Sequence, residues 1–203
     1  MTEVPARDAA ATRRRILDAA VEEFSDAGLA GGRVGRIAER ARANQRMIYA
    51  YFGSKDGLFE AVLTEKVLQA QAAVMFDAED LPGYACQVFD FYRANPRMVR
   101  LNLWQALERP DLLPSLAPVE RAMADKVAGI AAAQASGKVS AALPAEVLLD
   151  LTLALTYGNI AQAGNASLWP DSQRTALATA VSRLVGNDSP RSTVPGERGR
   201  RAR

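Results

Sequence analysis

One short stretch of the 203-residue chain carries side chains that could do chemistry on a nucleic acid. Gln45 and Arg46 begin a helical segment, and in the major groove of DNA a glutamine can pair bidentately with adenine and an arginine with guanine. Met47 can contact the methyl group of a thymine. Tyr49 and Tyr51 follow, with hydroxyl groups that can reach phosphates. The order of these residues predicts contacts with base edges first and with phosphates later.

Two short helices must position these side chains. The pattern predicts one helix over residues 34–41 and a second over residues 45–51, with Asn44 as the N-cap of the second. Such a pair is what a helix-turn-helix requires, and its second helix enters the major groove N-terminus first. Lys55, at the start of the next helix, can bind a phosphate alongside backbone N–H groups. From spacing alone, a plain helical hairpin with solvated arginines is nearly as good an interpretation.

The charges are distributed unevenly along the chain. Residues 1–55 carry a net charge of +3, residues 56–190 carry −5 and residues 191–203 carry +4, although the whole chain is only +2. A basic segment next to an acidic body is compatible with nucleic-acid binding, but a run of charges is more often just a solvated surface. Charge therefore supports the helix-turn-helix interpretation without deciding it.

The residue types exclude several kinds of catalysis. The chain has no histidine, which excludes Ser-His-Asp and Cys-His catalysis and HExxH metal sites. Its one cysteine, Cys86, can form neither an intrachain disulfide nor a thiolate zinc site. We expect no enzyme activity, no metal and no cofactor. We also find no secretory signal and no membrane-spanning stretch, and we expect a cytoplasmic protein with no membrane partner.

Helical periodicity and proline punctuation predict an all-α fold. The first helix is expected over residues 12–27, with Thr12 as its N-cap and Gly28 as its end. Beyond the two short helices, further helices are expected over residues 55–76, 82–94 and 97–108, then up to about Gly137, and over residues 144–164 and 170–186. Residues 187–203 are rich in Pro, Gly, Ser and Arg, a composition typical of a disordered tail.

Three motifs follow one another within residues 12–63. They are ILDAAVEEF before Gly28, then Val34 with IAERA, then IYAYFGSKDGLFEAV. With these motifs the stretch resembles the DNA-binding domain of the TetR family of bacterial transcriptional regulators. The resemblance implies a three-helix DNA-binding domain over residues 1–54 and a helical ligand-binding and dimerisation domain over residues 55–186. The basic tail over residues 187–203, predicted above from its composition to be disordered, is the third part.

The chain departs from the family pattern at the positions that face DNA. The family usually has Thr or Ser where Gly32 and Arg33 stand, so the charge of Arg33 would replace a hydroxyl group. It usually has Gly where Arg42 stands, and a positive φ at Arg42 would cost about 1 kcal/mol. The recognition helix opens with QRM at residues 45–47 in place of Lys-Gly-Thr, and AY stands at residues 50–51 in place of Tyr-His. The scaffold is typical of the family, whereas the reading positions are individual.

The resemblance assigns phosphate contacts to Tyr49 and Lys55, which occupy the family's own Tyr and Lys positions. Together with the residues predicted above, the expected DNA-binding set is Arg33, Asn44, Gln45, Arg46, Met47, Tyr49, Tyr51 and Lys55. The resemblance also implies a homodimer formed by the last two helices, with a seam from Leu148 to Leu184, on a pseudo-palindromic operator. A nonspecific architectural DNA-binding protein without a sensor is the alternative.

The central helices combine aromatic side chains with a few polar ones, as a ligand pocket does. The residues expected to line such a pocket are Tyr84, Tyr92, Asn102, Trp104, Gln105, Met123 and Asn159. We expect a repressor that is released from its operator by a small apolar or aromatic inducer bound near Trp104. A cationic inducer is one version of this hypothesis, with Glu108 or Asp90 as the neutralising carboxylate.

Overall fold

Helices make up most of the described part of the chain. The structure, a computed structural model, describes residues 6–162 and 170–186, and these residues contain no strand. The helices are α1 (Ala6–Gly31), α2 (Val34–Ala41), α3 (Gln45–Phe52), α4 (Lys55–Ala73), α5 (Leu81–Ala94), α6 (Pro96–Glu108), α7 (Leu112–Ser115), α8 (Ala117–Ala135), α9 (Ala145–Gln162) and α10 (Asp171–Val185). The predicted all-α fold is confirmed. The tail predicted over residues 187–203 lies outside the described residues.

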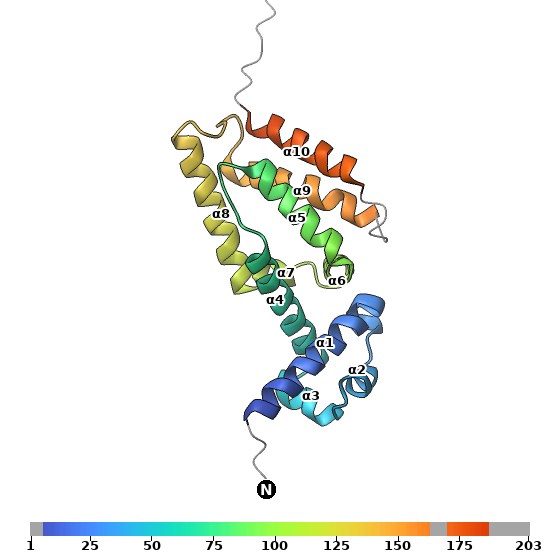
Figure 1. Cartoon of the computed structure of the whole chain (residues 1–203). Coiled ribbons are helices and arrows are strands. Elements are labelled where there is room, and N and C mark those ends of the chain that lie inside the picture. Colours follow the sequence, from blue (N-terminus) through green and yellow to red (C-terminus); the bar gives the residue numbers. More distant parts are fainter. Residues whose placement is uncertain (1–5, 163–169, 187–203) are drawn as a thin grey trace, which may run out of the picture.

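The helices form two groups joined by α4. In Figure 1, α1, α2 and α3 lie together at the N-terminal end, and α5, α8, α9 and α10 lie together at the other end. Helix α4 begins among the first group and runs toward the second, while α6 lies between the second group and α1. Two elements thus connect the groups.

Local sequence signals place most helix ends within a few residues. Ser54 Oγ accepts a hydrogen bond from the Gly57 N–H at 2.9 Å, which makes it the N-cap of α4 as predicted. The start of α1 was predicted wrongly. The helix already begins at Ala6, and Thr12 is buried within it and accepts a hydrogen bond from Arg15. The short helix α7, within the proline-rich connection, was not predicted.

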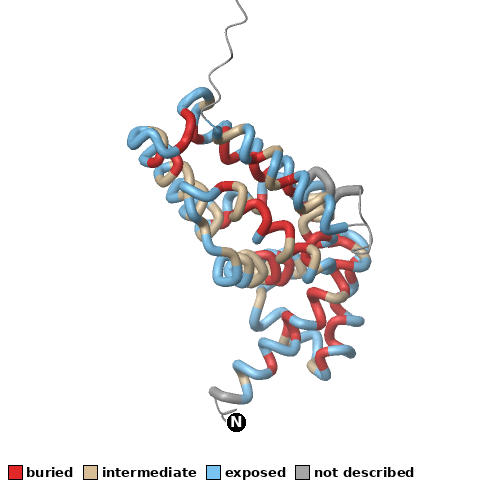
Figure 2. The backbone as a smooth tube through the Cα atoms, turned by 45° about the horizontal axis from the view of Figure 1, so that its top comes forward, coloured by how far each residue is buried: buried red, intermediate tan, exposed pale blue. Residues whose placement is uncertain are grey.

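The apolar residues form two buried clusters, visible as red segments in Figure 2. The first cluster contains residues of α1, α2, α3 and the N-terminal half of α4, and Leu101 of α6 also belongs to it. The second cluster contains residues of α5, α8, α9 and α10, with Met98 and Val99 of α6. Helix α6 therefore contributes to both clusters.

Gly28 allows α6 to approach α1 closely. Its φ of 71° and ψ of −175° break the helical geometry of α1, a conformation that is accessible essentially to glycine alone. A Cβ atom at this position would lie 2.7 Å from Glu108 Oε1 and 2.9 Å from the Trp104 ring. Glu108 Oε2 accepts the N–H of Leu29 at 2.6 Å, so the carboxylate caps the backbone just after the break. The chain then continues to Gly31, beyond the predicted end at Gly28.

Candidate functional site

Helices α2 and α3 form the predicted helix-turn-helix. Three residues connect them, and the first, Arg42, has a φ of 51°, the left-handed conformation considered above for this position. Asn44 Oδ1 accepts the Met47 N–H at 3.1 Å, so Asn44 is the N-cap of α3 as predicted. Ile48 is fully buried and anchors α3 to the first cluster. The turn and the core therefore fix the direction in which α3 presents its other residues.

The outward face of α3 is polar and aromatic. Gln45 and Arg46 are exposed at its N-terminus, and Tyr49 and Tyr51 are 46% and 36% exposed farther along. Met47 is half-buried beside them. This is the arrangement expected of a recognition helix, with groups that can contact base edges at one end and hydroxyl groups that can reach phosphates after them.

A buried carboxylate that sequence reasoning missed holds α2 in place. Glu23 of α1 is only 2% exposed and accepts hydrogen bonds from the Arg33 N–H at 2.9 Å and from Arg36 Nε at 2.8 Å. Arg40 lies 3.3 Å from its other oxygen. Burial by itself would raise the pKa of Glu23, but the hydrogen bonds from Arg36 and Arg33, with the charges of Arg36 and Arg40, lower it. Two arginines of the basic segment are thus committed to the fold.

The remaining predicted phosphate contacts lie at the junction of α1, α2 and α4. The Arg33 side chain is exposed, and its residue forms the N-cap of α2 without a side-chain cap. Lys55 Nζ donates to the carbonyl oxygens of Ala30 and Gly32, each at 3.3 Å. Lys55 therefore ties the start of α4 to the end of α1, in addition to the phosphate contact predicted for it. A Cβ atom at Gly32 would come within 2.7 Å of Phe24, which explains the small residue there.

A cavity of about 370 Å³ lies among α4, α5, α6, α8 and α9. This volume falls in the range of small-molecule sites, about 300 to 1,000 Å³. Most of its lining is apolar, and the polar lining residues are Gln71, Tyr84, Tyr92, Asn102, Gln105, Lys126 and Tyr157. Five of the predicted pocket residues line it, namely Tyr84, Tyr92, Asn102, Gln105 and Met123. The side chain of Asn159 lies outside the described residues.

The placement of Trp104 in the pocket was wrong. Trp104 lies on the face of α6 that packs against α1, where its Nε1–H donates to the Ser25 carbonyl oxygen at 3.3 Å. Its ring lies against Gly28, and it is not part of the cavity wall. The cavity lies on the other side of α6, along Asn102, Leu103 and Ala106. An aromatic residue of a helix that packs on two sides can face either one, so its type alone does not reveal its neighbours.

Polar groups gather at two places in the cavity wall. At one, Asn102 Nδ2 donates to the Tyr92 hydroxyl at 3.1 Å, and that hydroxyl lies 3.4 Å from the hydroxyl of Tyr157. Burial raises the pKa of both tyrosines. At the other, the Lys126 ammonium lies 5.3 Å from the centroid of the Tyr84 ring and 5.9 Å from that of Phe76. Tyr157 and Lys126 were absent from the predicted pocket set.

The two carboxylates suggested for a cationic inducer are engaged elsewhere. Glu108 caps the backbone of Leu29 and Ala30, as described above. Asp90 Oδ2 accepts from Arg174 Nε at 2.8 Å, and Asp90 also pairs with Arg93. No carboxylate is among the described residues that line the cavity. The structure therefore gives neither residue the position that this version of the hypothesis requires.

Helix α9 presents an apolar face to solvent. Val147, Leu151 and Leu155 follow at intervals of four residues and are 41%, 39% and 39% exposed. Leu148 is fully buried in the second cluster, and Leu184 of α10 is half-buried against that same cluster. The two ends proposed for the dimer seam thus face the chain's own core. The exposed face of α9, formed by Val147, Leu151 and Leu155, is next to the buried face that contains Leu148.

Other kinds of site find little support in the described residues. No group of three or more His, Cys, Asp or Glu residues among them is arranged to hold a metal ion. Cys86 is buried, and burial raises the pKa of its thiol. None of the described helices combines the length and the apolar character needed to cross a membrane. The recognition helix and the cavity are therefore the two sites to explain.

Comparison with known proteins agrees with both regions. Residues 16–62 match the family model for bacterial regulatory proteins of the tetR family, and residues 80–183 match the model for the tetracyclin repressor-like C-terminal domain. The chain is 36% identical over 188 residues to the HTH-type transcriptional repressor SCO4008 of Streptomyces coelicolor, covering 89% of this chain and 98% of that protein. It is 40% identical over 117 residues to the repressor NicS of Pseudomonas putida, covering 52% and 55% of the two chains.

Solved structures show the same architecture. The crystal structure of the transcriptional regulator SCO4942 from Streptomyces coelicolor superimposes with a TM-score of 0.74 at 35% sequence identity, covering 86% of this chain and 98% of that one. The matches of sequence, domain models and fold extend over both helical groups. The chain therefore belongs to the TetR family of DNA-binding transcriptional regulators.

Proposed function

We propose that the chain is a homodimeric repressor that releases a pseudo-palindromic operator when a small molecule enters the cavity. The observation that carries the DNA-binding part is the contrast within α3, where Ile48 is fully buried while Gln45, Arg46, Tyr49 and Tyr51 are exposed. The buried first cluster holds α3 in place, and the exposed side chains of α3 can bind base edges and phosphates. The names of SCO4008 and NicS, both repressors, support the sign of regulation.

Two helices offer a route from the cavity to the recognition helix. Helix α4 lines the cavity with Val67 and Ala70 and packs Leu58 and Phe59 into the first cluster. Helix α6 lines the cavity with Asn102 and binds α1 through its other face. We infer that a ligand which displaces α6 or α4 changes the position of α1 to α3 relative to the partner protomer. A ligand can shift this equilibrium only by its difference in affinity for the two arrangements, about 1.4 kcal/mol for each tenfold loss of operator affinity.

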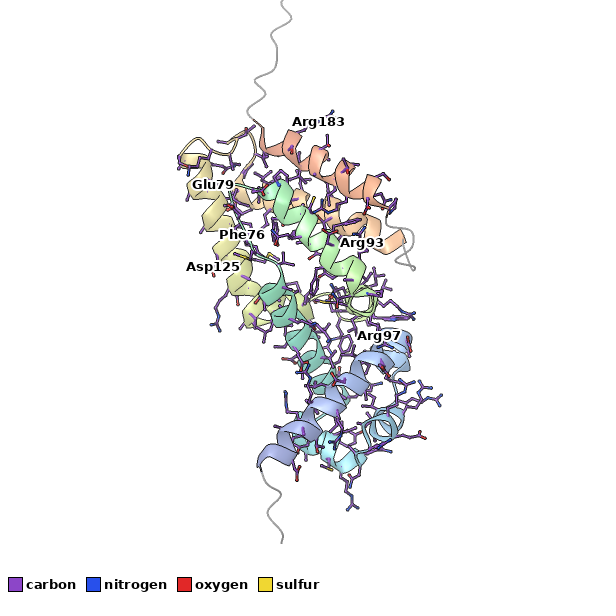
Figure 3. All side chains as sticks on the ribbon, in the orientation of Figure 1. Phe76, Glu79, Arg93, Arg97, Asp125 and Arg183 are labelled. Atoms are coloured by element: carbon purple, nitrogen blue, oxygen red, sulfur yellow. The ribbon has the colours of Figure 1, made fainter. Side chains whose placement is uncertain are left out.

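The contacts between α6 and α1 suit such a route because they are directional. Arg100 Nε donates to the Ser25 carbonyl oxygen at 2.8 Å, and Trp104 donates to the same atom. Arg97 pairs with Glu22 of α1 at 3.2 Å, and Figure 3 shows Arg97 between α6 and α1. Side chains along about two turns of α6 therefore hold the end of α1. Because these contacts are directional, a small movement of α6 would move α1 with it.

The exposed face of α9 is the proposed dimer seam. Three apolar side chains in a row on a helix surface are best explained by a partner surface. Helix α10 lies beside α9 and exposes Ala176, Thr179 and Arg183, of which Arg183 extends from its outer side in Figure 3. The small side chains of Ala176 and Thr179 would allow a second copy to approach α10 closely. This arrangement would place two recognition helices on successive half-sites.

The alternative, an architectural DNA-binding protein, does not account for the cavity. DNase I footprinting on DNA flanking the chain's own and neighbouring genes tests the two. The repressor predicts protection of one segment of defined length, lost in the double variant Gln45→Ala/Arg46→Ala. Arg121→Ala, which removes the same kind of charge from the exposed surface of α8, outside both α3 and the proposed seam, should leave that protection unchanged. Protection spread evenly over all DNA would contradict sequence-specific repression.

A further inference from the structure

We propose that the cavity selects a compact aromatic anion, such as a carboxylate, whose acidic group pairs with Lys126. This inference rests on the proposed function of the cavity as the ligand site and adds the chemical class of the ligand. It departs from the cationic inducer considered in the sequence analysis, because the described lining residues include a lysine and no carboxylate.

Lys126 is a cation without a carboxylate partner in the described part of the chain. Its ammonium forms no ion pair or hydrogen bond with those residues, and its charge faces the rings of Phe76 and Tyr84. Burial lowers its pKa, which shows that the surroundings disfavour the charge. Cation–π contacts offset only part of such a cost, about 0.5 to 2 kcal/mol each. An anion in the cavity would supply the missing counter-charge.

Neither the carboxylates of α8 nor Glu79, near Phe76, fills that role. Asp125 is exposed, and Figure 3 shows it on the outer side of α8, away from α5. Glu79, labelled above Phe76 in the same view, pairs with Lys138 at 2.6 Å. Glu120, one and a half turns earlier on α8, is exposed. The position opposite Lys126 is therefore open to a ligand.

Tyr84 adds a hydrogen-bond donor at the same place. Its side chain is 4% exposed, and its hydroxyl forms no hydrogen bond with the described residues. Burial raises the pKa of Tyr84 to about 12, so the phenol stays protonated at neutral pH. Because Tyr84 lines the cavity, its hydroxyl is free to donate to a ligand oxygen there. An ammonium and a phenol beside each other form a site for an acceptor that carries negative charge.

The rest of the wall selects an apolar, flat body. Val67, Val88, Phe91, Met98 and Met123 come from four different helices and surround the space with hydrocarbon, an aromatic ring and thioether groups. The hydroxyl pair of Tyr92 and Tyr157, with Asn102, can bind a second polar substituent away from Lys126. These features describe an aromatic acid with at most one further polar group.

Three biphenyl probes of the same shape test the charge directly. They are biphenyl-4-carboxylate, biphenyl-4-carboxamide and biphenyl-4-carboxamidine, which are anionic, neutral and cationic. Calorimetric titration into the DNA-free protein should show the carboxylate binding at least about tenfold more tightly than the other two, the size of one charge-assisted contact. Lys126→Met should remove this preference and leave the affinity for the carboxamide nearly unchanged. Lys126→Arg should keep the preference.

Lys66→Met is the matched control, because Lys66 bonds to Gln69 outside the cavity wall, and it should behave as the wild type. Tighter binding of the carboxamide or the carboxamidine would overturn the inference and leave the proposed function standing. Equal loss for all three probes in Lys126→Met would also overturn it, because Lys126 would then serve shape and not charge. Binding of none of the probes would overturn the inference together with the ligand-responsive part of the function, while footprinting still tests DNA binding separately.

Discussion

The recognition module and the cavity region differ in where their polar residues lie. Those of α3 in the module face solvent, whereas several of those that line the cavity are buried. In the module formed by α1, α2 and α3, the apolar core is sealed and the groups of α3 that suit DNA point to solvent. In the cavity region, Tyr92 and Gln105 belong to the packed interior and also line the cavity. Gln105 Nε2 donates to the Arg109 carbonyl oxygen at 2.6 Å. The side chain thus binds the backbone at the C-terminal end of α6 and also lines the cavity.

In the recognition module, different residues serve stability and the proposed function. In the cavity region, the same residues serve both. A substitution on the outer face of α3 should remove a proposed contact with DNA and leave the core intact. A substitution in the cavity wall should change the packing of two or three helices as well as the proposed ligand contact. Variants that distinguish the two regions therefore need matched controls for folding.

The largest effect is expected at the proposed seam, which decides whether the module works singly or in pairs. Leu151→Glu places a charge on the exposed apolar face of α9 and should yield monomers in sedimentation. Operator affinity should fall at least about 100-fold, because the two half-sites are then no longer bound together. Leu107→Glu, at a leucine that is 77% exposed on α6, is the control and should remain dimeric. A dimeric Leu151→Glu would move the seam away from α9.

The junction between the regions should be the next most sensitive place. Gly28→Ala forces a side chain into a backbone conformation reserved for glycine and against Trp104 and Glu108. We expect the free energy of unfolding to fall by about 2 kcal/mol or more, since the backbone strain alone costs about 1 to 3 kcal/mol. Thermal or urea denaturation measures this. Gly53→Ala is the comparison, because φ is also positive there but nothing lies within 4 Å of the added atom. Equal losses would show that contact with α6 adds nothing.

Glu23→Gln tests the electrostatic support of the module. The variant keeps the shape of the side chain but removes the charge that pairs with Arg36 and Arg40, and we expect a loss of about 1 to 3 kcal/mol in the free energy of unfolding. The pKa of Glu23 is lowered on folding, so its contribution is present above about pH 4.3, the ordinary glutamate value, and is lost as pH falls through the folded pKa. Stability of Glu23→Gln should therefore depend less on pH below that value. An unchanged profile would exclude this role.

The smallest effect is expected at the turn of the helix-turn-helix. Arg42→Gly relieves the positive φ at this position and should raise the free energy of unfolding by about 1 kcal/mol. Arg42→Lys keeps both the charge and the strain and should match the wild type. Comparison of the three melting curves decides this, and a destabilised Arg42→Gly would show that the arginine side chain contributes more than its backbone costs.

The sequence alone was sufficient for most of the module because its signals are local. Asn44 and Ser54 cap helices three residues away from the N–H groups that they bind, and the unusual position of Arg42 follows from the family pattern. The cavity depends instead on contacts between distant residues. Trp104 and Gly28 are far apart in sequence, and only the fold shows that they meet. Lys126, in an alanine-rich helix, has the sequence context of an ordinary surface lysine, so nothing in that context marks it as a cavity residue.

Selection of bound sites from random DNA, with the wild-type protein and with Arg46→Ala, tests whether α3 reads DNA sequence. We expect a motif of two symmetric half-sites for the wild type. For Arg46→Ala we expect the loss of preference at one base pair in each half-site, at a cost of about 1 to 3 kcal/mol in operator affinity, while the rest of the motif persists. An identical motif for both proteins would remove Arg46 from base reading, and no motif for the wild type would show that α3 does not read DNA sequence.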